Sequence, residues 1–500
     1  MPNTKKPQSN TTERPPTVAI MGHIDHGKST LLDYIRKSNV ADKEVGGITQ
    51  NMSAYEVIHA SKKITFLDTP GHESFSQLRS RGANVADLAV LVVSAEDGVK
   101  PQTLDALKSI TEAKLPYIVA INKIDKAGAD IERTKLSLAE HNVFVEGYGG
   151  TISCVPISAK VGTGVSELLD LILLTAEMSE LQGDVEKPAE GIVIETNRDR
   201  SGISASMIIK NGTLKRGDVV VAGNAISPVR MLEDFAGRPI DSATFSSPVR
   251  VIGFSEMPKV GSPFHTFDSK KEAEKFVAKT ASEPAHNQIN QNKIQESPNV
   301  YILPIIIKAS TSGVIEAIDF EINKIKNDRI AFKVLYSGIG DISENDIKIA
   351  SGKEGTLVIG FATKVDGSAK ALAERLGVQI QVFDIIYKLT EWLAQIALER
   401  TPKMEVEEQK GRVKILKFFS RAKDRQVIGG RVEEGVLTVG DTVRILRRDV
   451  EIGRGSVREI QQAKAKTSEV LAGTEFGAMI ESKIELAPGD KVEPFHTVSK

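Results

Sequence analysis

The stretch TVAIMGHIDHGKSTLLDYIRKS, residues 17–38, joins an apolar run, a glycine-bounded loop and a helical continuation. Gly22 to Ser29 fits the pattern G-x-x-x-x-G-K-[ST], in the strand–loop–helix context that this pattern requires. The glycines let successive backbone N–H groups face phosphate oxygens at the positive end of a helix. Lys28 can reach the outer phosphates, and the Ser29 hydroxyl can coordinate Mg²⁺. The stretch therefore predicts a phosphate-binding loop at the start of a nucleotide-binding domain.

Two histidines and an aspartate crowd the same loop at His23, Asp25 and His26, so a metal or catalytic cluster is an alternative interpretation. A phosphate cradle explains the glycines and Lys28 through backbone geometry and charge, whereas a metal site requires neither. We therefore expect the glycines and Lys28 to hold the phosphates and the histidines not to bind a metal.

Residues 16–186 alternate continuous apolar runs with helical periods. The apolar runs are TVAIM, KITFLDT, LAVLVVSA, PYIVAIN and TISCVPISA. Strands this uniformly apolar are typical of a parallel sheet covered on both faces. The clearest helix has apolar residues at i, i+3, i+4 and i+7, namely Val165, Leu168, Leu169, Ile172, Leu173 and Ala176. This segment is predicted to be a doubly wound α/β domain.

Polar residues follow the later strands, at the edge where open α/β sheets bind their ligands. Asp68 closes the second apolar run, where a carboxylate can hold Mg²⁺ through water. Asp125 in NKID, residues 122–125, can accept hydrogen bonds from guanine N1–H and the exocyclic amine, which adenine lacks. SAK, residues 158–160, can bring the Ala159 N–H near guanine O6. The order and spacing of these segments predict GTP or GDP as the nucleotide.

Two loops are predicted to sense the γ-phosphate. Thr49 in GGITQ lies between the first helix and the second strand, where switch threonines cap Mg²⁺; a solvent-facing loop residue is the alternative. Gly71 can turn its N–H toward the γ-phosphate, and His72 stands where many GTPases place a glutamine that orients water. His72 could instead only stabilise the loop. Because no arginine finger is evident, we expect slow intrinsic hydrolysis and activation by a large partner.

The predicted site is large, and its members come from five separate segments of the chain. The predicted Mg²⁺ contacts are Ser29, Thr49 and Asp68, the last through water. The predicted nucleotide contacts are Gly22, His23, Ile24, Asp25, His26, Gly27, Lys28, Ser29, Thr30, Asp68, Thr69, Pro70, Gly71, His72, Asn122, Lys123, Ile124, Asp125, Ser158, Ala159 and Lys160.

After residue 186, the pattern of apolar and polar residues changes several times along the chain. We predict a β-barrel at 187–268, a helix and flexible linker at 269–298, a small α/β domain at 299–383, a connecting helix at 384–410 and a second β-barrel at 411–500. The stretches NGTLKRGDVVVAG, from Asn211, and EGVLTVGDTVRIL, from Glu434, share G-x-L-x-x-G-D-x-V, and APGDKVEPF is a weaker echo. We interpret this as one barrel module used twice, the alternative being a common strand-entry turn. KASTSGVIEA in the small α/β domain lacks a following G-K-[ST], so it is predicted to be a plain strand-to-helix turn.

Composition favours a multidomain globular protein. The chain has 500 residues, a formal net charge of −1 and one cysteine, which excludes an internal disulfide and a cysteine-based zinc site. Cys154 is expected to be a buried strand residue rather than a nucleophile. Residues 1–15 are polar and proline-rich, which predicts a disordered tail rather than a signal peptide. No apolar stretch reaches about 18 residues, and together these features predict a cytoplasmic protein.

GHIDHGKSTLLD, DTPGHESF and NKID together resemble the translational GTPases. GGITQNMSAYEV, RGANVADLAVLVVSAEDGVKPQT, IVIETNRDRSG and YSGIGDISENDIKIA narrow the resemblance to bacterial translation initiation factor two, in a short form without the long N-terminal extension. The resemblance covers the chain after residue 15. It implies a monomer that binds both ribosomal subunits with their RNA, other initiation factors and formylmethionyl initiator tRNA. It also implies hydrolysis stimulated by the large subunit through His72, with Asp25 as a second catalytic residue that lies near a monovalent cation and helps to place His72.

The resemblance assigns the formylmethionyl group and the acceptor end of the tRNA to the last barrel. GRVKILKFFSRAKDRQVIGGRV and GTEFGAMIE align with the family pattern and give Phe419, Lys423, Gly429, Gly430, Glu475, Phe476 and Gly477. Family members usually have Cys where Gly430 and Phe476 stand, so the pocket is expected to be apolar but different in shape. This barrel has 17 Lys and Arg against 13 Asp and Glu, which is only mildly basic and fits an ordinary exposed face as well.

Two alternatives to an initiation factor remain open. An elongation factor for a special aminoacyl-tRNA would follow its nucleotide domain with two barrels in succession, whereas here an α/β domain intervenes. A protein that holds GTP as a switch without meaningful turnover is the second alternative. Hydrolysis measured with and without ribosomes distinguishes a switch from an enzyme.

Overall fold

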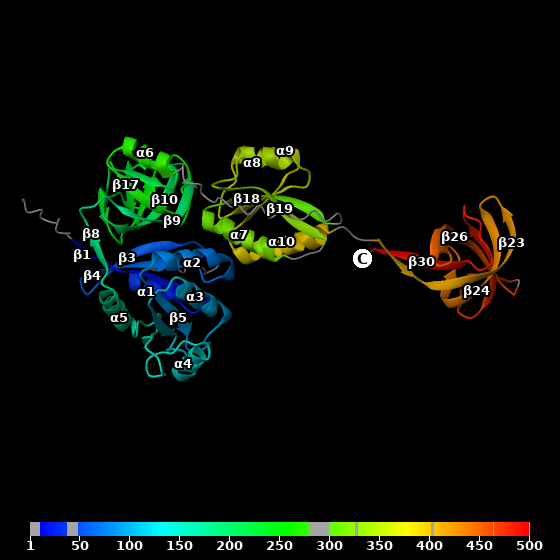
Figure 1. Ribbon diagram of the computed structural model, residues 1–500, viewed down its shortest axis with the longest axis horizontal. Coiled ribbons are helices and arrows are strands. Elements are labelled where there is room, and N and C mark those ends of the chain that lie inside the picture. The colour runs from blue at the N-terminus through cyan, green and yellow to red at the C-terminus, as the bar shows by residue number, and fades with distance from the viewer. Residues whose placement is uncertain are drawn as a thin grey trace, which may run out of the picture. The chain divides into compact units, whose positions relative to one another are not determined.

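The structure is a computed structural model that describes residues 11–37, 49–199, 201–280, 300–325, 329–401, 405–463 and 465–499. The chain divides into two compact units, Met1–Arg400 and Thr401–Lys500. The first unit contains three large sheets and the second contains a closed barrel (Figure 1).

The phosphate-binding loop belongs to an open α/β domain, as predicted. Its strands are β2 (Thr17–Gly22), β3 (Ser53–His59), β4 (Lys62–Asp68), β5 (Leu88–Ser94), β6 (Tyr117–Asn122) and β7 (Cys154–Pro156). Its α-helices are α1 (Lys28–Arg36), α2 (Ser76–Val85), α3 (Pro101–Glu112), α4 (Ile131–Glu140) and α5 (Val165–Met178). The sheet order is β3-β4-β2-β5-β6-β7, parallel except for the β3–β4 pair. Every residue of β2 and β5 is buried because helices cover both faces.

The apolar periodicity of α5 places its core face correctly. The residues of α5 that are buried are the six predicted ones, from Val165 to Ala176. Cys154 lies on β7 and is half-buried, and burial raises the pKa of its thiol to about 11. A raised thiol pKa disfavours the thiolate, which agrees with a strand residue rather than a nucleophile.

An antiparallel barrel domain follows. Its main sheet contains β9 (Glu190–Asp199), β10 (Gly202–Asn211), β12 (Val219–Ala222), β13 (Ala225–Pro228), β14 (Met231–Asp234), β16 (Pro248–Ile252) and β17 (Pro263–Phe267), in the order β13-β12-β17-β9-β10-β16-β14. The strands β11 (Thr213–Lys215) and β15 (Ser242–Thr244) form a separate pair. Met207, Val220 and Phe264 are fully buried in its core. Helix α6 (Lys270–Thr280) packs Ala273 beside Val219 and Val221 of β12.

The small α/β domain has a four-stranded parallel sheet. Its strands are β18 (Tyr301–Ala309), β19 (Ile330–Ile339), β20 (Leu357–Phe361) and β21 (Gln379–Phe383), in the order β19-β18-β20-β21. Its helices are α7 (Ser312–Lys324), α8 (Glu344–Ser351), α9 (Gly367–Leu376) and α10 (Ile386–Arg400). Helices α7 and α10 cover one face and α8 and α9 the other (Figure 1). The face covered by α7 and α10 shares its apolar cluster with Phe75 and Leu78 of the nucleotide domain.

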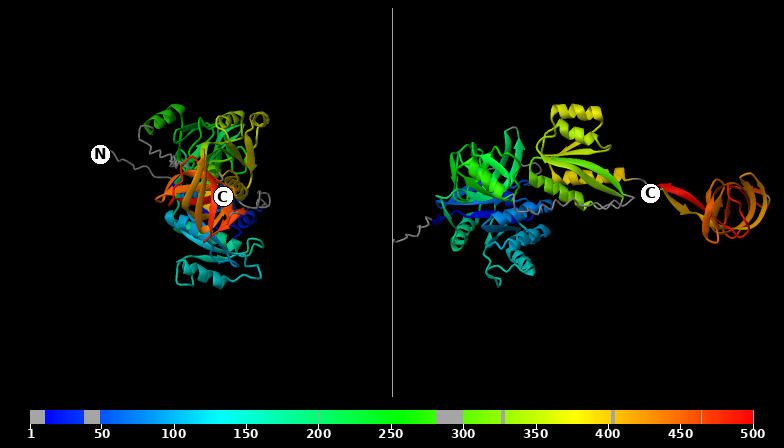
Figure 2. Two further views of the ribbon diagram at one scale, coloured as in Figure 1. Left: turned by 90° about the vertical axis from the view of Figure 1, so that its right-hand side faces the viewer. Right: turned by 45° about the horizontal axis from the view of Figure 1, so that its top comes forward.

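The second unit is a closed antiparallel barrel. Its strands are β22 (Glu405–Gln409), β23 (Gly411–Ala422), β24 (Arg425–Thr438), β25 (Thr442–Arg447), β26 (Val450–Gln462), β27 (Ala465–Thr467), β28 (Glu469–Leu471), β29 (Glu475–Glu481) and β30 (Lys491–Ser499). The order β30-β23-β24-β29-β26-β25 closes through a β25–β30 pairing, and Figure 2 shows this ring in orange and red. Closure leaves no open edge on these strands.

The repeated G-D motif forms the same turn each time it occurs. The Asp218 carboxylate accepts from the Lys215 N–H at 2.7 Å, and Asp441 accepts from the Thr438 N–H at 2.8 Å. In the weaker third copy, Asp490 accepts from the N–H three residues earlier, also at 2.8 Å. The preceding glycine has φ of 104°, 96° and 93° respectively, in the left-handed region that favours glycine. The shared motif therefore reports a shared local structure in both barrels.

Two boundaries differ from the sequence prediction. Thr11–Glu13 form strand β1, which pairs with β8 (Gln182–Asp184), so the predicted disordered tail is wrong for these residues. Arg14 adds an ion pair with the buried carboxylate of Asp87, which a search for apolar patterns does not detect. Residues 1–10 and the predicted linker at 281–299 lie outside the described residues. The connecting helix ends at Arg400, and β22 of the barrel begins at Glu405, before the predicted boundary at 411.

Among the described residues, no helix is both long enough and apolar enough to cross a membrane.

Candidate functional site

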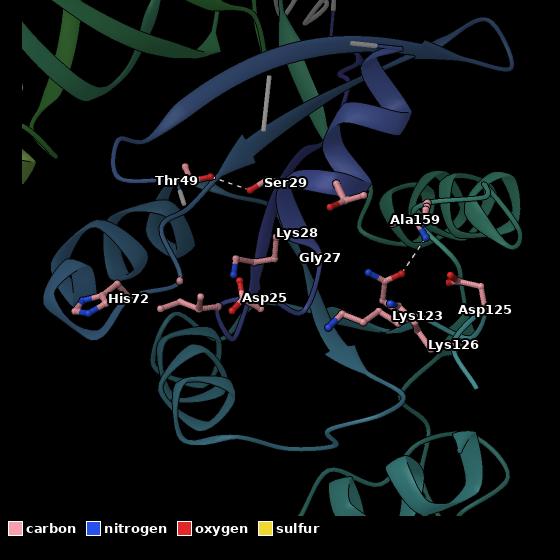
Figure 3. A pocket seen from close by; sticks show the side chains of 15 residues that line it. Asp25, Gly27, Lys28, Ser29, Thr49, His72, Lys123, Asp125, Lys126 and Ala159 are labelled. Atoms are coloured by element: carbon pink, nitrogen blue, oxygen red, sulfur yellow. Dashed lines mark hydrogen bonds between the residues drawn. The ribbon is translucent and has the colours of Figure 1, made fainter. Parts of the chain in front are cut away.

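A cavity of about 310 Å³ lies where β2, β4 and β6 end, at the carboxyl edge of the first sheet (Figure 3). Open α/β sheets bind ligands at this edge because the strand-to-helix loops converge there. The residues that line the cavity are Ile24, Asp25, Gly27, Lys28, Ser29, Thr30, Thr49, Gly71, His72, Asn122, Lys123, Asp125, Lys126, Ala159 and Lys160. All of them except Lys126 were predicted from the sequence.

The loop before α1 is shaped by glycine. At Gly22, with φ of 144°, a side chain would place Cβ 2.3 Å from the Val92 carbonyl oxygen. At Gly27, with φ of 87°, Cβ would lie 2.3 Å from the Asn122 amide nitrogen. Both positions therefore require glycine for conformation and for space. The backbone N–H of Ile24 donates to Gln102 Oε1 at 3.0 Å, so the first turn of α3 also holds the loop.

Lys28 is buried inside this loop and is held by carbonyl groups. Its Nζ donates to Gly22 O at 3.0 Å and to His23 O at 2.7 Å. Burial lowers the pKa of Lys28 to about 8, against the opposing charge of Asp68. A phosphate group at this position would favour the charged ammonium, because an adjacent opposite charge raises a lysine pKa. The lysine is thus placed in advance for an anionic ligand.

The three predicted Mg²⁺ contacts lie together. Ser29 Oγ and Thr49 Oγ1 are 2.9 Å apart (Figure 3). Thr49 Oγ1 also donates to Asp68 Oδ2 at 3.3 Å. Hydroxyl and carboxylate oxygens are the ligands that Mg²⁺ prefers, and it usually binds through few protein groups together with phosphates. No cluster of three or more His, Cys, Asp and Glu with metal-binding geometry occurs in the described ranges. The oxygen set at Ser29 therefore fits Mg²⁺ held jointly with a nucleotide.

The opposite end of the cavity carries the predicted base-recognition groups. Asp125 accepts from the Ser158 hydroxyl at 2.7 Å, and this bond lowers the pKa of Asp125. The side chain therefore remains an ionised acceptor near neutral pH. The Ala159 N–H, expected near guanine O6, donates instead to Asn122 Oδ1 at 2.9 Å, while Asn122 Nδ2 donates to His26 O at 2.8 Å. Asn122 thus ties the phosphate loop to the base loop.

His23 and His26 contribute packing rather than ligands. His26 is buried, and burial lowers the pKa of its imidazole to about 3, so the ring is neutral. Its Nδ1 lies 3.4 Å from Val92 O, and its ring contacts His23 edge-on with centroids 4.9 Å apart. Burial also lowers the pKa of His23. Both imidazoles thus pack within the loop, and the prediction that they do not bind a metal stays a prediction.

His72 follows Gly71 at the end of β4 and begins a short 3-10 helix, Glu73–Phe75. Its Nδ1 accepts from the Ser74 N–H at 3.1 Å. Burial lowers the pKa of His72, so the imidazole is neutral near pH 7. In Figure 3 the ring points away from Lys28. The described residues record no hydrogen bond between Asp25 and His72, so the predicted action of Asp25 on His72 stays a prediction.

Sequence reasoning missed Arg79, which anchors the loop that carries His72. Its guanidinium is 1% exposed and donates to the carbonyls of Pro70 at 3.4 Å, Gly71 at 3.3 Å and His72. Burial lowers the pKa of Arg79. Nothing in the local pattern of α2 distinguishes this arginine from the neighbouring Arg81, because its partners are backbone carbonyls seven to nine residues earlier.

The residues predicted to bind the tRNA end lie on two faces of the barrel wall. Gly430 pairs with Phe476 and faces the core, where Phe476 is 6% exposed and lies 3.1 Å from the Cβ position of Gly430. Gly429 pairs with Gly477 on the other face, because successive strand residues alternate in direction. Phe419 lies over Gly429 and is 63% exposed.

The expected apolar pocket is therefore not assembled from these residues. Phe476 belongs to the apolar core cluster, next to the space that a side chain at Gly430 would need. Lys423 occupies the β23–β24 turn with φ of 58°, and Glu475 is exposed. A cavity of about 570 Å³ elsewhere in this barrel is lined by Asp424, Arg454, Glu481, Ser482, Lys483 and Ile484, none of which was predicted.

The chain resembles known families along most of its length. Residues 13–178 match the elongation factor Tu GTP-binding domain, residues 188–267 match elongation factor G domain 2, and residues 277–394 match translation-initiation factor 2. A crystal structure of GDP-bound aIF5B from Aeropyrum pernix has a TM-score of 0.46 and 27% identity, covering 97% of this chain and 92% of that chain.

Three relatives that match nearly the whole chain are each named translation initiation factor IF-2. The chloroplastic translation initiation factor IF-2 of Rhodomonas salina is 39% identical over 98% of this chain and 66% of its own length. The translation initiation factor IF-2 of Pelotomaculum thermopropionicum is 40% identical over 97% and 51%, and that of Halothermothrix orenii is 38% identical over 96% and 72%. The chain thus spans about half to three quarters of the length of these relatives. Because identity at this level extends across the nucleotide domain, both barrels and the small α/β domain, the chain belongs to the translation initiation factor 2 family.

Proposed function

We propose that this protein is a translation initiation factor that binds and hydrolyses GTP. The observation that carries the proposal is the geometry of one cavity. Lys28 and the Ser29–Thr49–Asp68 oxygens lie at one end of the cavity, and the ionised Asp125 lies at the other. A nucleoside triphosphate has the matching arrangement of chemical groups, with phosphates at one end and a base at the other.

Different groups of this cavity would bind the metal ion and the base of the nucleotide. The Ser29 and Thr49 hydroxyls, with Asp68 through water, would hold Mg²⁺, which supplies charge neutralisation for the phosphates when it is bound. Asp125 accepts from guanine N1–H and the exocyclic amine, and Asn122 keeps its loop in register with the phosphate loop. A monovalent cation near Asp25 remains part of the proposal through the family resemblance.

His72 is the proposed catalytic residue for hydrolysis. A neutral imidazole can hydrogen-bond an attacking water, and general catalysis by a positioned side chain contributes roughly 10² to 10⁴ in rate. Its ring must first turn toward the phosphate end of the cavity, because it points away from Lys28 and its Nδ1 accepts from the Ser74 N–H. We therefore propose that the ribosome stimulates hydrolysis by holding the His72 ring in the position that faces the phosphates.

The proposed partners are both ribosomal subunits with their RNA, formylmethionyl initiator tRNA and other initiation factors. The protein would act in the cytoplasm as a monomer, placing the tRNA on the small subunit and promoting subunit joining. In the C-terminal barrel, the exposed residues Phe419 and Lys423 and the Gly429–Gly477 pair can contact RNA directly. Gly430 and Phe476 face the core, so they would affect RNA binding only by shaping the barrel wall that carries the exposed residues.

Two measurements test the proposal. GTP hydrolysis should accelerate strongly when ribosomes are added, and absence of acceleration would favour a switch without turnover. Formylated initiator tRNA should bind more tightly than the unformylated form. Equal affinities would refute the assignment of the C-terminal barrel while leaving the GTPase assignment intact.

A further inference from the structure

The small α/β domain reaches the two segments that surround the nucleotide. Gln50, directly after Thr49, donates from Nε2 to Asp384 O at 2.7 Å and accepts from the Ile386 N–H at 3.2 Å. Lys324 on α7 pairs with Glu73 at 2.8 Å, beside His72. The domain thus holds both loops at which GTP and GDP would differ.

The small α/β domain also holds His72 through Ser74. The Ser74 hydroxyl lies 2.6 Å from His72 Nδ1 and donates to Glu321 Oε1 on α7. Nδ1 already accepts from the Ser74 N–H, and the single hydroxyl proton favours the charged carboxylate, because hydrogen bonds to ionised groups are the stronger ones. Ser74 therefore engages Nδ1 through both its backbone and its side chain, which fixes the orientation of the ring.

Tyr387, in the first turn of α10, contacts the imidazole. The ring centroids are 4.6 Å apart with an interplanar angle of 74°, the edge-to-face geometry that stabilises aromatic pairs. Burial, and then the charges of Asp25 and Glu321, raise the pKa of Tyr387, so its phenol stays protonated at neutral pH. The aromatic ring thus packs against His72 from the small α/β domain.

Glu321 is suited to a restraint of this kind. The side chain is 4% exposed, and its second oxygen accepts from the Thr390 hydroxyl of α10 at 3.2 Å. One buried carboxylate therefore joins Ser74 in the nucleotide domain to both helices of the small α/β domain. Lys324 of the same helix lies 3.8 Å from this carboxylate, but separation from Ser74 would still remove one of its buried hydrogen bonds, which favours the present arrangement.

We propose that Glu321 and Tyr387 are positioning residues that hold the His72 ring turned away from Lys28, so that the small α/β domain suppresses GTP hydrolysis until it shifts relative to the nucleotide domain. This inference rests on the proposed catalytic role of His72. The restraint acts through the orientation of the ring and not through nucleotide affinity, since neither Glu321 nor Tyr387 lines the cavity.

Single-turnover GTP hydrolysis by the full chain without ribosomes tests the restraint. Tyr387→Leu should raise the rate up to about tenfold, because it removes the edge-to-face contact that holds the imidazole. Tyr387→Phe keeps the ring contact and should behave like the wild type. Glu321→Gln removes the charged acceptor with little change in shape and should raise the rate about threefold. GTP affinity should stay unchanged in all three variants.

Matched controls separate this restraint from general loosening of the interface. Glu316 lies on the same helix as Glu321 and pairs with Arg81 of α2, but it does not touch His72 or Ser74, so Glu316→Gln should leave the rate unchanged. Tyr301 is 39% exposed, close to the 40% of Tyr387, and lies on β18, so Tyr301→Leu is the control for loss of a tyrosine.

A double variant shows whether the gain passes through His72. Combining His72→Ala with Tyr387→Leu should abolish the increase. The inference is overturned if neither Tyr387→Leu nor Glu321→Gln raises the rate, if Glu316→Gln raises it equally, or if the increase survives without His72. Failure of the proposed function has a different signature, which is a ribosome-stimulated rate that His72→Ala does not change.

Discussion

The nucleotide cavity and the C-terminal barrel differ in how their predicted residues are arranged. In the cavity, Ser29, Thr49 and Asp68 come from distant segments, and Thr49 still lies within hydrogen-bonding distance of the other two. In the barrel, Gly430 and Phe476 face the core while Gly429 and Phe419 lie on the outer face. The first site is complete in the folded chain, whereas the second is divided by the wall of the barrel.

The difference follows from what each site uses for recognition. Phosphate binding relies on backbone N–H groups and fixed charges, which a loop of defined φ and ψ positions without help from side-chain shape. A pocket in a barrel wall depends on side-chain volume, where the exchange of one residue for a larger one fills the space. Phe476 packed against Gly430 is such a case.

The largest expected effect concerns the base-recognition end of the cavity. A site that hydrogen-bonds a group of its ligand rejects an analogue lacking that group by about 10⁴-fold, so the wild type should prefer GTP to ATP by about this factor. Asp125→Asn should lose most of this preference and favour xanthosine triphosphate, whose 2-oxo group accepts from an amide. Competition binding measures both. An unchanged preference for GTP would show that Asp125 does not read the base.

The next effect concerns the core of the barrel. Phe476→Ala should destabilise this barrel by about 3–5 kcal/mol, as expected for a buried phenylalanine. Phe419→Ala should change stability by less than about 0.5 kcal/mol, because its side chain is exposed. Hydrogen exchange of the barrel amides in the full chain measures both values. Similar losses for the two variants would contradict the division of the residues between two faces.

RNA binding should depend more directly on Phe419 than on Phe476, which is the reverse of the order expected for stability. An exposed aromatic ring that stacks on a base contributes about 1–3 kcal/mol, so Phe419→Ala should weaken initiator tRNA binding about tenfold or more. Lys417→Ala on the same strand is a control for charge alone and should mainly change the salt dependence of binding. An unaltered tRNA affinity in Phe419→Ala would remove the outer face from the binding surface.

The smallest effect tests whether the two barrels share a module. Asp218→Ala and Asp441→Ala each remove one side-chain bond to the backbone N–H three residues earlier. Each should cost about 1 kcal/mol of local stability, the usual value for such a bond, and the losses should be similar. Local hydrogen exchange again provides the measurement. A loss in only one barrel would mean that the shared letters do not imply a shared role.

Features within one segment were predictable from the sequence. The glycines of the phosphate loop, the buried face of α5 and the repeated G-D turn each depend on residues a few positions apart. The role of Thr49 was predicted from its loop, but its approach to Asp68 depends on β3, which runs antiparallel to β4 and begins opposite Asp68.

Features that join distant segments were not predictable in this way. Arg79 resembles any helix arginine until the loop folds back over it. Tyr387 meets His72 across more than 300 residues, and no local pattern marks either as a partner. In the barrel, Gly429 and Gly430 are neighbours in the sequence and differ only in the face of the sheet on which they lie. That face depends on a register with several shifts between β23 and β24.

The most direct test of the account compares single-turnover GTP hydrolysis on ribosomes for the wild type and His72→Ala. The account predicts that ribosomes accelerate the wild type, and that His72→Ala loses about 10³-fold in rate while binding GTP with unchanged affinity. Equal ribosome-stimulated rates for the two proteins would contradict the central role assigned to His72.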